Sequence, residues 1–324
     1  MVVSTLRQRR HVREAKIIGL GSYLPSTVVA SDEVAARFGR DEEWVLARTG
    51  IATRRRAEKE TVSQLAVKAA TRALARCALT GGDMDLVIVA SCSVEQPMPD
   101  VASGVARALG AEEAGAFDLN AACAGFCYAL AVAADAVRMG SARHVLVIGA
   151  EKMTAWVDPE DLGTSIIFGD GAGAAVVGPA EEPGIGPVAW GSDGTRAELI
   201  EVPDGKRTMN MDGRAVFRWA TTEIYPVAQR ACDLAGVAPA DLDALVPHQA
   251  NLRIVNALAT KIGATNAVIA DDVIRYGNTS AASIPIALDT LITEGTVEHN
   301  GTALLFGFGA GLCYAAQVVT LPTA

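Results

Sequence analysis

One cysteine combines a reactive side chain with a favourable position in the sequence. Cys123 follows Asn120, Ala121 and Ala122 and opens a segment with apolar residues at helical spacing. Unpaired N–H groups at a helix start stabilise a thiolate, and small neighbours leave room for an acyl group. The pattern predicts a nucleophile that forms a thioester, provided that partner residues exist. The remaining cysteines are interpreted as inert core residues: Cys77, Cys92, Cys127, Cys232 and Cys313.

Two residues in the second half of the chain could be these partners. His248, in LVPHQANLRI, follows a predicted buried strand and precedes a helix, which places it at the strand edge where α/β proteins bind ligands. Asn278, in GNTSAAS, is interpreted either as a helix cap or as a functional donor. His11, His144 and His299 are predicted to lie at the surface.

Two glycine-rich segments, 168–178 and 306–316, resemble nucleotide loops only superficially. The first lacks the Lys and Ser/Thr of a phosphate-binding loop, and neither segment lies in a strand-to-helix unit with a following acidic residue. Close backbone packing or an oxyanion hole of N–H groups suits them better. Cys123 and Cys127 are too few ligands for a metal site, so we expect no bound metal.

The elements around these residues indicate an α/β protein. Short β-branched runs at 86–91 and 145–150 are typical of buried strands, and 62–79 and 123–140 show helical spacing. Four residue pairs share an offset of 158 positions: Asp83 and Asp241, Asp85 and Asp243, Asn120 and Asn278, and Gly149 and Gly307. The repeat predicts two similar halves, each with the order helix, strand, helix, helix, strand.

The predicted halves span 16–180 and 181–324, after a solvated tail at 1–15. The boundary falls in GPAEEPGIGP, where Gly, Pro and acidic residues cluster. No long flexible linker is present there, so we expect the halves to pack as one unit. Functional residues should therefore come from both halves, with a site at their junction.

Composition excludes several functional classes. The 324 residues carry 28 Lys plus Arg against 37 Asp plus Glu, a net charge of −9 that argues against a general nucleic-acid binder. Apolar residues make up 50% of the chain, as in a folded globular protein. No apolar run is long enough to span a membrane, and the cysteines are too dilute for a disulfide scaffold. We expect a cytoplasmic protein.

Several long motifs resemble one enzyme family. AACAGFCYAL around Cys123, VPHQANLRI around His248 and GNTSAAS around Asn278 are similar to β-ketoacyl-acyl carrier protein synthase III, the initiating ketosynthase of type II fatty acid and some aromatic polyketide pathways. GSYLP, DEEWVLARTGI, FGDGAGAA and FGFGAG extend the likeness from about residue 16 to 320. The resemblance implies a duplicated thiolase-like fold, layered α-β-α-β-α, and a homodimer.

The resemblance also implies a Cys-His-Asn triad with two steps. Cys123 would attack an acyl thioester while the N–H groups of Cys123 and Ala310 hold the oxyanion. Malonyl-acyl carrier protein would then lose carbon dioxide, and His248 and Asn278 would donate hydrogen bonds to the enolate. No cofactor is implied, since coenzyme A and carrier-protein phosphopantetheine thioesters are substrates.

Further positions are implied to bind substrates and partners. Trp44 and Leu162 match residues that flank the coenzyme A adenine, Arg48 lies near its phosphates, and Phe217 and Asn251 are substrate-binding. Arg214, Arg218 and Arg253 would form a cationic surface for acyl carrier protein. Met98 matches the residue that enters the partner's acyl pocket. The family usually has an arginine where this chain has Leu162, which leaves the acyl donor open.

Two other functions compete with condensation. An acyltransferase of the same fold would use Cys123 and His248 without condensation, but Asn278, an enolate stabiliser, argues for condensation. An inactive dimer partner would lack the nucleophile, whereas Cys123 is present.

Overall fold

The computed structural model describes residues 13–322. Strand β1 (Glu14–Tyr23) begins within the predicted tail, so Glu14 and Ala15 belong to the fold. Ala15 is fully buried and pairs with Pro179, so β1 includes two residues that the charge pattern assigned to the tail. The rest of the predicted tail, residues 1–12, lies outside the described residues.

The fold contains two five-stranded sheets, and the strands follow the same order in both when each sheet is described from its corresponding edge. The first has the order β1-β7-β6-β4-β5, formed by β1, β4 (Leu86–Ala90), β5 (Gly115–Leu119), β6 (Val145–Lys152) and β7 (Asp170–Ala180). The second has the order β8-β14-β13-β11-β12, formed by β8 (Ala189–Ser192), β11 (Ala244–Pro247), β12 (Val268–Ile269), β13 (Thr302–Gly309) and β14 (Cys313–Thr320). In each sheet four strands run in one direction, and only β7 in the first sheet and β14 in the second run against the others.

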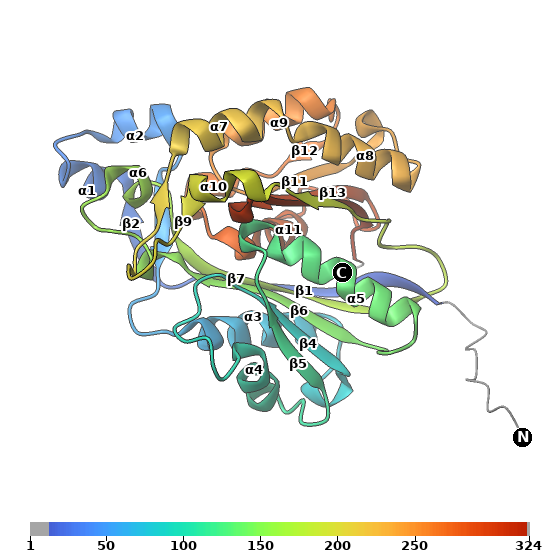
Figure 1. Cartoon of the computed structure of the whole chain (residues 1–324). Helices are drawn as coiled ribbons and strands as arrows, with labels where there is room; N and C mark the ends of the chain where they lie inside the picture. The colour runs from blue at the N-terminus through green and yellow to red at the C-terminus, as the bar shows by residue number, and fades with distance from the viewer. Residues whose placement is uncertain (1–12, 323–324) are drawn as a thin grey trace, which may run out of the picture.

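Helices form three layers around these two sheets (Figure 1). The outer layers are α3 (Val62–Arg76) and α4 (Val101–Leu109) on the first sheet, and α7 (Gly213–Thr222), α8 (Tyr225–Ala235) and α9 (Leu252–Ile262) on the second. Between the sheets lie α5 (Gly125–Arg138) and α11 (Ser283–Thr293). The predicted duplicated, five-layered thiolase-like fold is confirmed.

The predicted order of elements was wrong in one respect, because it omitted β5 and β12. β5 carries Asp118 and small residues at a sheet edge, and β12 has only two residues, so neither shows the apolar run of a buried strand. The smaller elements are β2 (Thr27–Ala30), β3 (Thr53–Arg56), β9 (Ile200–Glu201), β10 (Asn210–Met211), α1 (Ser31–Ala36), α2 (Glu42–Thr49), α6 (Leu162–Ser165) and α10 (Val273–Tyr276). Within residues 13–322, no helix is long and apolar enough to cross a membrane.

The two central helices begin in the same unusual way. Each follows a one-turn 3₁₀ helix, η2 (Ala122–Ala124) before α5 and η6 (Ser280–Ala282) before α11. Ala122 and Ser280, 158 positions apart, both have positive φ angles, of 45° and 49°. A left-handed residue that is not glycine is strained and needs surrounding contacts to hold it. The duplicated fold therefore has two matching helix starts at the centre of the molecule. We call them the two entrances: η2 with the start of α5, and η6 with the start of α11.

Candidate active site

Cys123 lies in η2, and α5 begins two residues later at Gly125, whereas the sequence predicts that the helix starts at Cys123 itself. The Asn120 side-chain oxygen accepts the Ala122 N–H at 3.1 Å and supports the left-handed turn. Gly309, at the end of β13, packs directly on this cysteine: a Cβ added there would lie 2.7 Å from the Cys123 Cβ and 2.9 Å from its Sγ. The close backbone packing predicted for segment 306–316 thus brings the neighbouring Ala310 to the nucleophile.

Asn278 is held by the other glycine-rich segment. Its N–H donates to the Ile167 carbonyl at 2.9 Å, and its own carbonyl accepts the Gly169 N–H at 3.0 Å. Its side-chain Oδ1 accepts the Ser280 N–H at 2.8 Å, in the same manner as Asn120 caps Ala122. Among residues 13–322 the Nδ2 group of Asn278 has no hydrogen-bond partner, so the residue is both a cap and a free donor.

His248 follows β11 directly, as the sequence indicates. Its N–H donates to the Phe306 carbonyl at 2.7 Å, and its ring Nδ1 lies 2.7 Å from Ser283 Oγ. The edge of one ring meets the face of the other between His248 and Phe308, with centroids 5.3 Å apart. Burial lowers the His248 pKa from 6.5 to about 3. The imidazole is therefore neutral at physiological pH.

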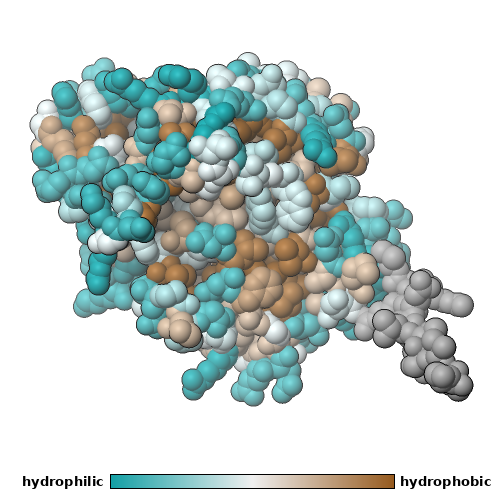
Figure 2. Space-filling view, viewed as in Figure 1, coloured by the Kyte–Doolittle hydropathy of each residue, from teal (hydrophilic) through white to brown (hydrophobic). Residues whose placement is uncertain are grey.

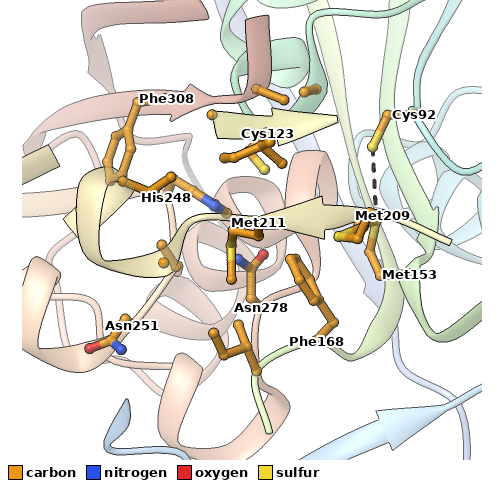
Figure 3. Close-up of a pocket in the computed structure, with 18 of the residues that line it drawn as sticks. Cys92, Cys123, Met153, Phe168, Met209, Met211, His248, Asn251, Asn278 and Phe308 are labelled. Carbon is orange, nitrogen blue, oxygen red and sulfur yellow. Dashed lines mark hydrogen bonds between the residues drawn. The ribbon is translucent and has the colours of Figure 1, made fainter. Parts of the chain in front are cut away.

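One cavity of about 280 Å³ brings the three residues together. Figure 3 shows the Cys123 sulfur, the His248 ring nitrogen and the Asn278 amide turned toward the same space. Its lining also includes the predicted Ala310, Phe217 and Asn251. The volume is near the lower end of the roughly 300–1,000 Å³ range of ligand pockets. It suits the slender end of an acyl thioester rather than a whole nucleotide.

The electrostatics of Cys123 differ from the sequence expectation. The sequence predicts that the helix start stabilises its thiolate, but burial raises the Cys123 pKa to about 12. The Ser280 hydroxyl lowers this pKa and the Glu151 carboxylate raises it further. Desolvation of the charged form outweighs the hydrogen bonds from the Ser280 hydroxyl and the backbone N–H, so the pKa rises. In the resting protein Cys123 is therefore a thiol.

Glu151 is a buried residue that the sequence reading missed. Its carboxylate accepts hydrogen bonds from Ser91 Oγ at 3.0 Å, from Ser93 Oγ and from the Cys92 N–H at 3.2 Å, and from the Ala281 N–H at 3.3 Å. Burial raises its pKa. These bonds join the first half to η6 directly behind the nucleophile. The sequence did hold one signal for Glu151, which is an acidic residue near the end of the buried strand β6.

One end of the cavity is apolar and rich in sulfur. Cys92, Met153 and Met209 line it together with Phe168 and Trp156, and Cys92 Sγ lies 3.8 Å from Met153 Sδ (Figure 3). Cys92 was interpreted as an inert core residue, and this is corrected: it is half-buried because loop 91–100 carries it past β4 into the cavity wall. Flexible thioethers adapt to apolar groups of varied shape, so this end is suited to an acyl chain.

The residues predicted to bind adenine lie outside the cavity. The Arg48 guanidinium lies 3.8 Å from the Trp44 ring centroid, and Arg40 lies 5.3 Å from it. Leu162, the first residue of α6, packs on the same small apolar cluster as Trp44. Asn251 Nδ2 donates to the Arg48 carbonyl at 3.0 Å, which connects this cluster to the cavity wall.

Arg214, Arg218 and Arg253 are exposed beside the cavity. Arg214 and Arg218 lie on α7, whose residues Gly213, Val216 and Phe217 line the cavity, and Arg253 stacks at 5.0 Å on the Phe217 ring.

The predicted Met98 is 82% exposed. Within residues 13–322 there is no group of three or more His, Cys, Asp or Glu side chains that could hold a metal ion.

Comparisons with known proteins identify the family. The chain matches 3-oxoacyl-[acyl-carrier-protein] synthase III over residues 117–194 and the C-terminal region of that family over residues 232–321. It is 47% identical to a β-ketoacyl-[acyl-carrier-protein] synthase III of Mycobacteroides abscessus, covering 96% of both chains. It belongs to this family.

Two further relatives extend the comparison. β-Ketoacyl-[acyl-carrier-protein] synthase III 4 of Streptomyces coelicolor is 48% identical, over 95% of this chain and 99% of the relative. The crystal structure of the priming β-ketosynthase from the R1128 polyketide biosynthetic pathway superposes with a TM-score of 0.94, at 45% identity and 98% coverage of each chain. The prediction of an initiating ketosynthase of fatty acid or polyketide biosynthesis is confirmed.

Proposed function

We propose that this protein primes itself with an acyl group on Cys123 and then condenses that group with malonyl-acyl carrier protein. The observation that carries the proposal is one buried cavity in which a thiol meets an unpaired amide donor and a neutral imidazole. A thiol alone supports acyl transfer. The additional donors suit a reaction in which negative charge develops on a substrate oxygen.

In the priming step the Cys123 sulfur attacks the carbonyl of an acyl thioester. A carbon–sulfur bond forms, the bond to the donor's sulfur breaks, and the Cys123 proton ends on the released donor thiol. The N–H groups of Cys123 and Ala310 are suited to hold the tetrahedral oxyanion, because Gly309 lets the two segments touch. The sulfur-rich end of the cavity would receive the acyl chain.

In the condensation step malonyl-acyl carrier protein replaces the first donor. Its carboxylate leaves as carbon dioxide, and the electron pair forms an enolate whose oxygen would be held by His248 and Asn278. The enolate carbon attacks the acyl-Cys123 carbonyl, and the bond to Sγ breaks. The leaving thiolate takes a proton from water, which restores the thiol and releases 3-oxoacyl-acyl carrier protein.

The proposed macromolecular partner is acyl carrier protein, docking on Arg214, Arg218 and Arg253. These exposed arginines lie on α7 and α9 beside the cavity, on a protein whose net charge is −9, so a basic surface there would guide an acidic partner to the entrance. Trp44 and Arg48 would receive the coenzyme A nucleotide when the primer comes as acyl-coenzyme A. We place the reaction in the cytoplasm, where all six cysteines would stay unpaired, as they are here.

A second copy of the chain is the proposed structural partner. β5 is an edge strand of its sheet and carries the exposed Phe117. Figure 2 shows an apolar area on the face where β5 leads into α5. Exposed strand edges with apolar side chains need a partner, and a homodimer would supply one. The exposed Met98 would then reach the neighbouring subunit.

Two parallel measurements separate condensation from simple acyl transfer. The purified protein is incubated with acetyl-coenzyme A and carboxyl-labelled malonyl-acyl carrier protein. Mass spectrometry detects acetyl-Cys123, and trapped label reports decarboxylation. Condensation predicts both, together with a 3-oxobutanoyl carrier product. Acylation of Cys123 followed by transfer to the carrier without released label would support the acyltransferase alternative instead.

A further inference from the structure

Ser283 forms a buried contact with the catalytic imidazole. The Ser283 and His248 residues are each 2% exposed, and 2.7 Å separates Ser283 Oγ from His248 Nδ1. Ser283 is the first residue of α11, five positions after Asn278 in the GNTSAAS motif. The sequence reading gave it no role. The contact matters because a neutral imidazole carries only one N–H, on either Nδ1 or Nε2.

Counting hydrogen-bond donors and acceptors locates that proton. The Gln249 N–H donates to Ser283 Oγ at 3.3 Å, which uses one acceptor site of the hydroxyl. Among the hydrogen bonds of residues 13–322, His248 Nδ1 is the only acceptor available to the hydroxyl's own proton. The hydroxyl therefore donates to Nδ1, and Nδ1 carries a lone pair. The ring proton is then on Nε2.

We propose that Ser283 is a positioning residue that holds His248 as the Nε2-protonated tautomer, so that the cavity contains a second N–H donor beside Asn278 Nδ2. This inference rests on the proposed condensation. An Nε2–H group stabilises negative charge on an enolate oxygen, whereas a lone pair on Nε2 would repel it. Ser283 thus acts through His248 and does not touch the substrate.

The duplicated fold offers an internal comparison for this role. The residue 158 positions before Ser283 is Gly125, the first residue of α5. A Cβ at Gly125 would lie 3.2 Å from Ala90 Cβ and 3.6 Å from Ala281 Cβ, so there is little room for a hydroxyl. The nucleophile-bearing half therefore lacks this group. The hydroxyl occurs only in the half that supplies the donors.

The first experiment reads the tautomer in the resting protein. The chain has four histidines, so a ¹⁵N-histidine NMR spectrum is simple, and His248→Asn assigns the His248 signals. We expect Nε2 protonated and Nδ1 unprotonated at pH 7.5. Ser283→Ala should shift the population toward the Nδ1–H form, and Ser283→Thr, which keeps a hydroxyl, should restore the original form. An Nδ1-protonated His248 in the unaltered protein overturns the proposal without any variant.

The second experiment separates the two half-reactions. Ser283→Ala should acylate Cys123 from acetyl-coenzyme A within about twofold of the unaltered protein, and should release labelled carbon dioxide at least tenfold more slowly, in line with loss of an oxyanion donor. Ser283→Thr should recover most of that loss. Unchanged carbon dioxide release, or equal losses in both steps, overturns the proposal. Failure of the unaltered protein to release carbon dioxide would instead overturn the proposed function, while the tautomer remains measurable.

Discussion

The entrances to the two central helices have the same backbone and different chemistry. At η2 and α5 the sequence Asn120, Ala122, Cys123 provides a cap, a left-handed turn and a nucleophile. At η6 and α11 the matching positions are Asn278, Ser280 and Ala281, where the cap is kept and the nucleophile is absent. In the proposed mechanism, the first copy supplies the nucleophile for covalent catalysis and the second supplies a donor that stabilises negative charge.

The difference between the two entrances extends to their neighbours. His248 directly follows β11, whereas the residue 158 positions earlier is Ala90, which is fully buried at the end of β4. A duplicated element can therefore change function through a few side chains while its backbone and capping bonds stay fixed. The Asn side-chain oxygens cap both helix starts and so support the shared backbone. The side chains that bear on the chemistry can differ between the two copies.

The largest expected effect comes from removing the nucleophile. Cys123→Ala should abolish acyl-enzyme formation, measured by mass spectrometry after incubation with acyl thioester, and leave the fold intact. Moving the cysteine to the matching place, in Cys123→Ala with Ala281→Cys, should not restore acylation, because residue 281 is 1% exposed and does not line the cavity. An acyl mass in either variant would contradict the comparison.

Next in size is the change that separates capping from catalysis at the second entrance. Asn278→Asp keeps an oxygen for the Ser280 N–H but replaces the Nδ2 donor by a second carboxylate oxygen. Carbon dioxide release should fall by roughly 10²- to 10³-fold, as expected for a lost oxyanion donor, while Cys123 acylation persists. Asn120→Asp is the matched comparison, because it keeps the oxygen that caps Ala122 and adds the same charge to the cavity wall, and it should lose far less decarboxylation than Asn278→Asp. Undiminished release in Asn278→Asp would exclude the donor role.

The sequence predicted which residues of the two halves correspond only where both halves keep the same spacing. The offset of 158 holds at β4 and β11, at the turns η2 and η6 and near the ends of β6 and β13, which is why it paired Asn120 with Asn278. β7 and β14 fall outside it, because α6 and its flanking loop follow β6 and have no counterpart after β13. Local motifs supplied the nucleophile and its partners.

What the sequence could not predict are contacts that depend on burial between distant segments. Glu151 reaches Ala281 across 130 positions, and Ser283 reaches His248 across 35, so neither contact has a local signature. The Cys123 pKa was misjudged for the same reason: a helix start is visible in sequence, but the desolvation that raises this pKa is not.

The buried imidazole at His248, absent at Ala90, makes a prediction about stability. Its pKa of about 3 in the folded state lies below the unfolded value of 6.5, so between these pH values the unfolded chain binds more protons. The free energy of unfolding should therefore fall as the pH drops below 6.5, by about 1.4 kcal/mol per pH unit from this residue alone. The free energy of unfolding is measured by denaturant titration at several pH values from 6.5 to 4.5. Its decrease per pH unit should be smaller in His248→Asn than in the unaltered protein. Equal slopes would mean that the imidazole is not desolvated.

The smallest expected effect concerns the acyl donor, at a position with no equivalent in the second half. Leu162 packs with Trp44 in one apolar cluster, and the Arg48 guanidinium already covers one face of that indole. Leu162→Arg would place a second planar cation near the indole, where it could hold an adenine against the ring. Such contacts contribute about 0.5 to 2 kcal/mol, which is several-fold to roughly thirtyfold in affinity.

Turnover with acyl-coenzyme A should therefore rise in Leu162→Arg, while turnover with the matching acyl-carrier protein stays nearly unchanged, because that donor has no adenine. Leu162→Gln controls for loss of the apolar side chain and should give no gain, since an amide supplies no cation. Side-by-side kinetics with both donors measure the effect. Equal changes in turnover with the two donors would show that position 162 does not face the nucleotide. The choice of acyl donor would then not depend on this position.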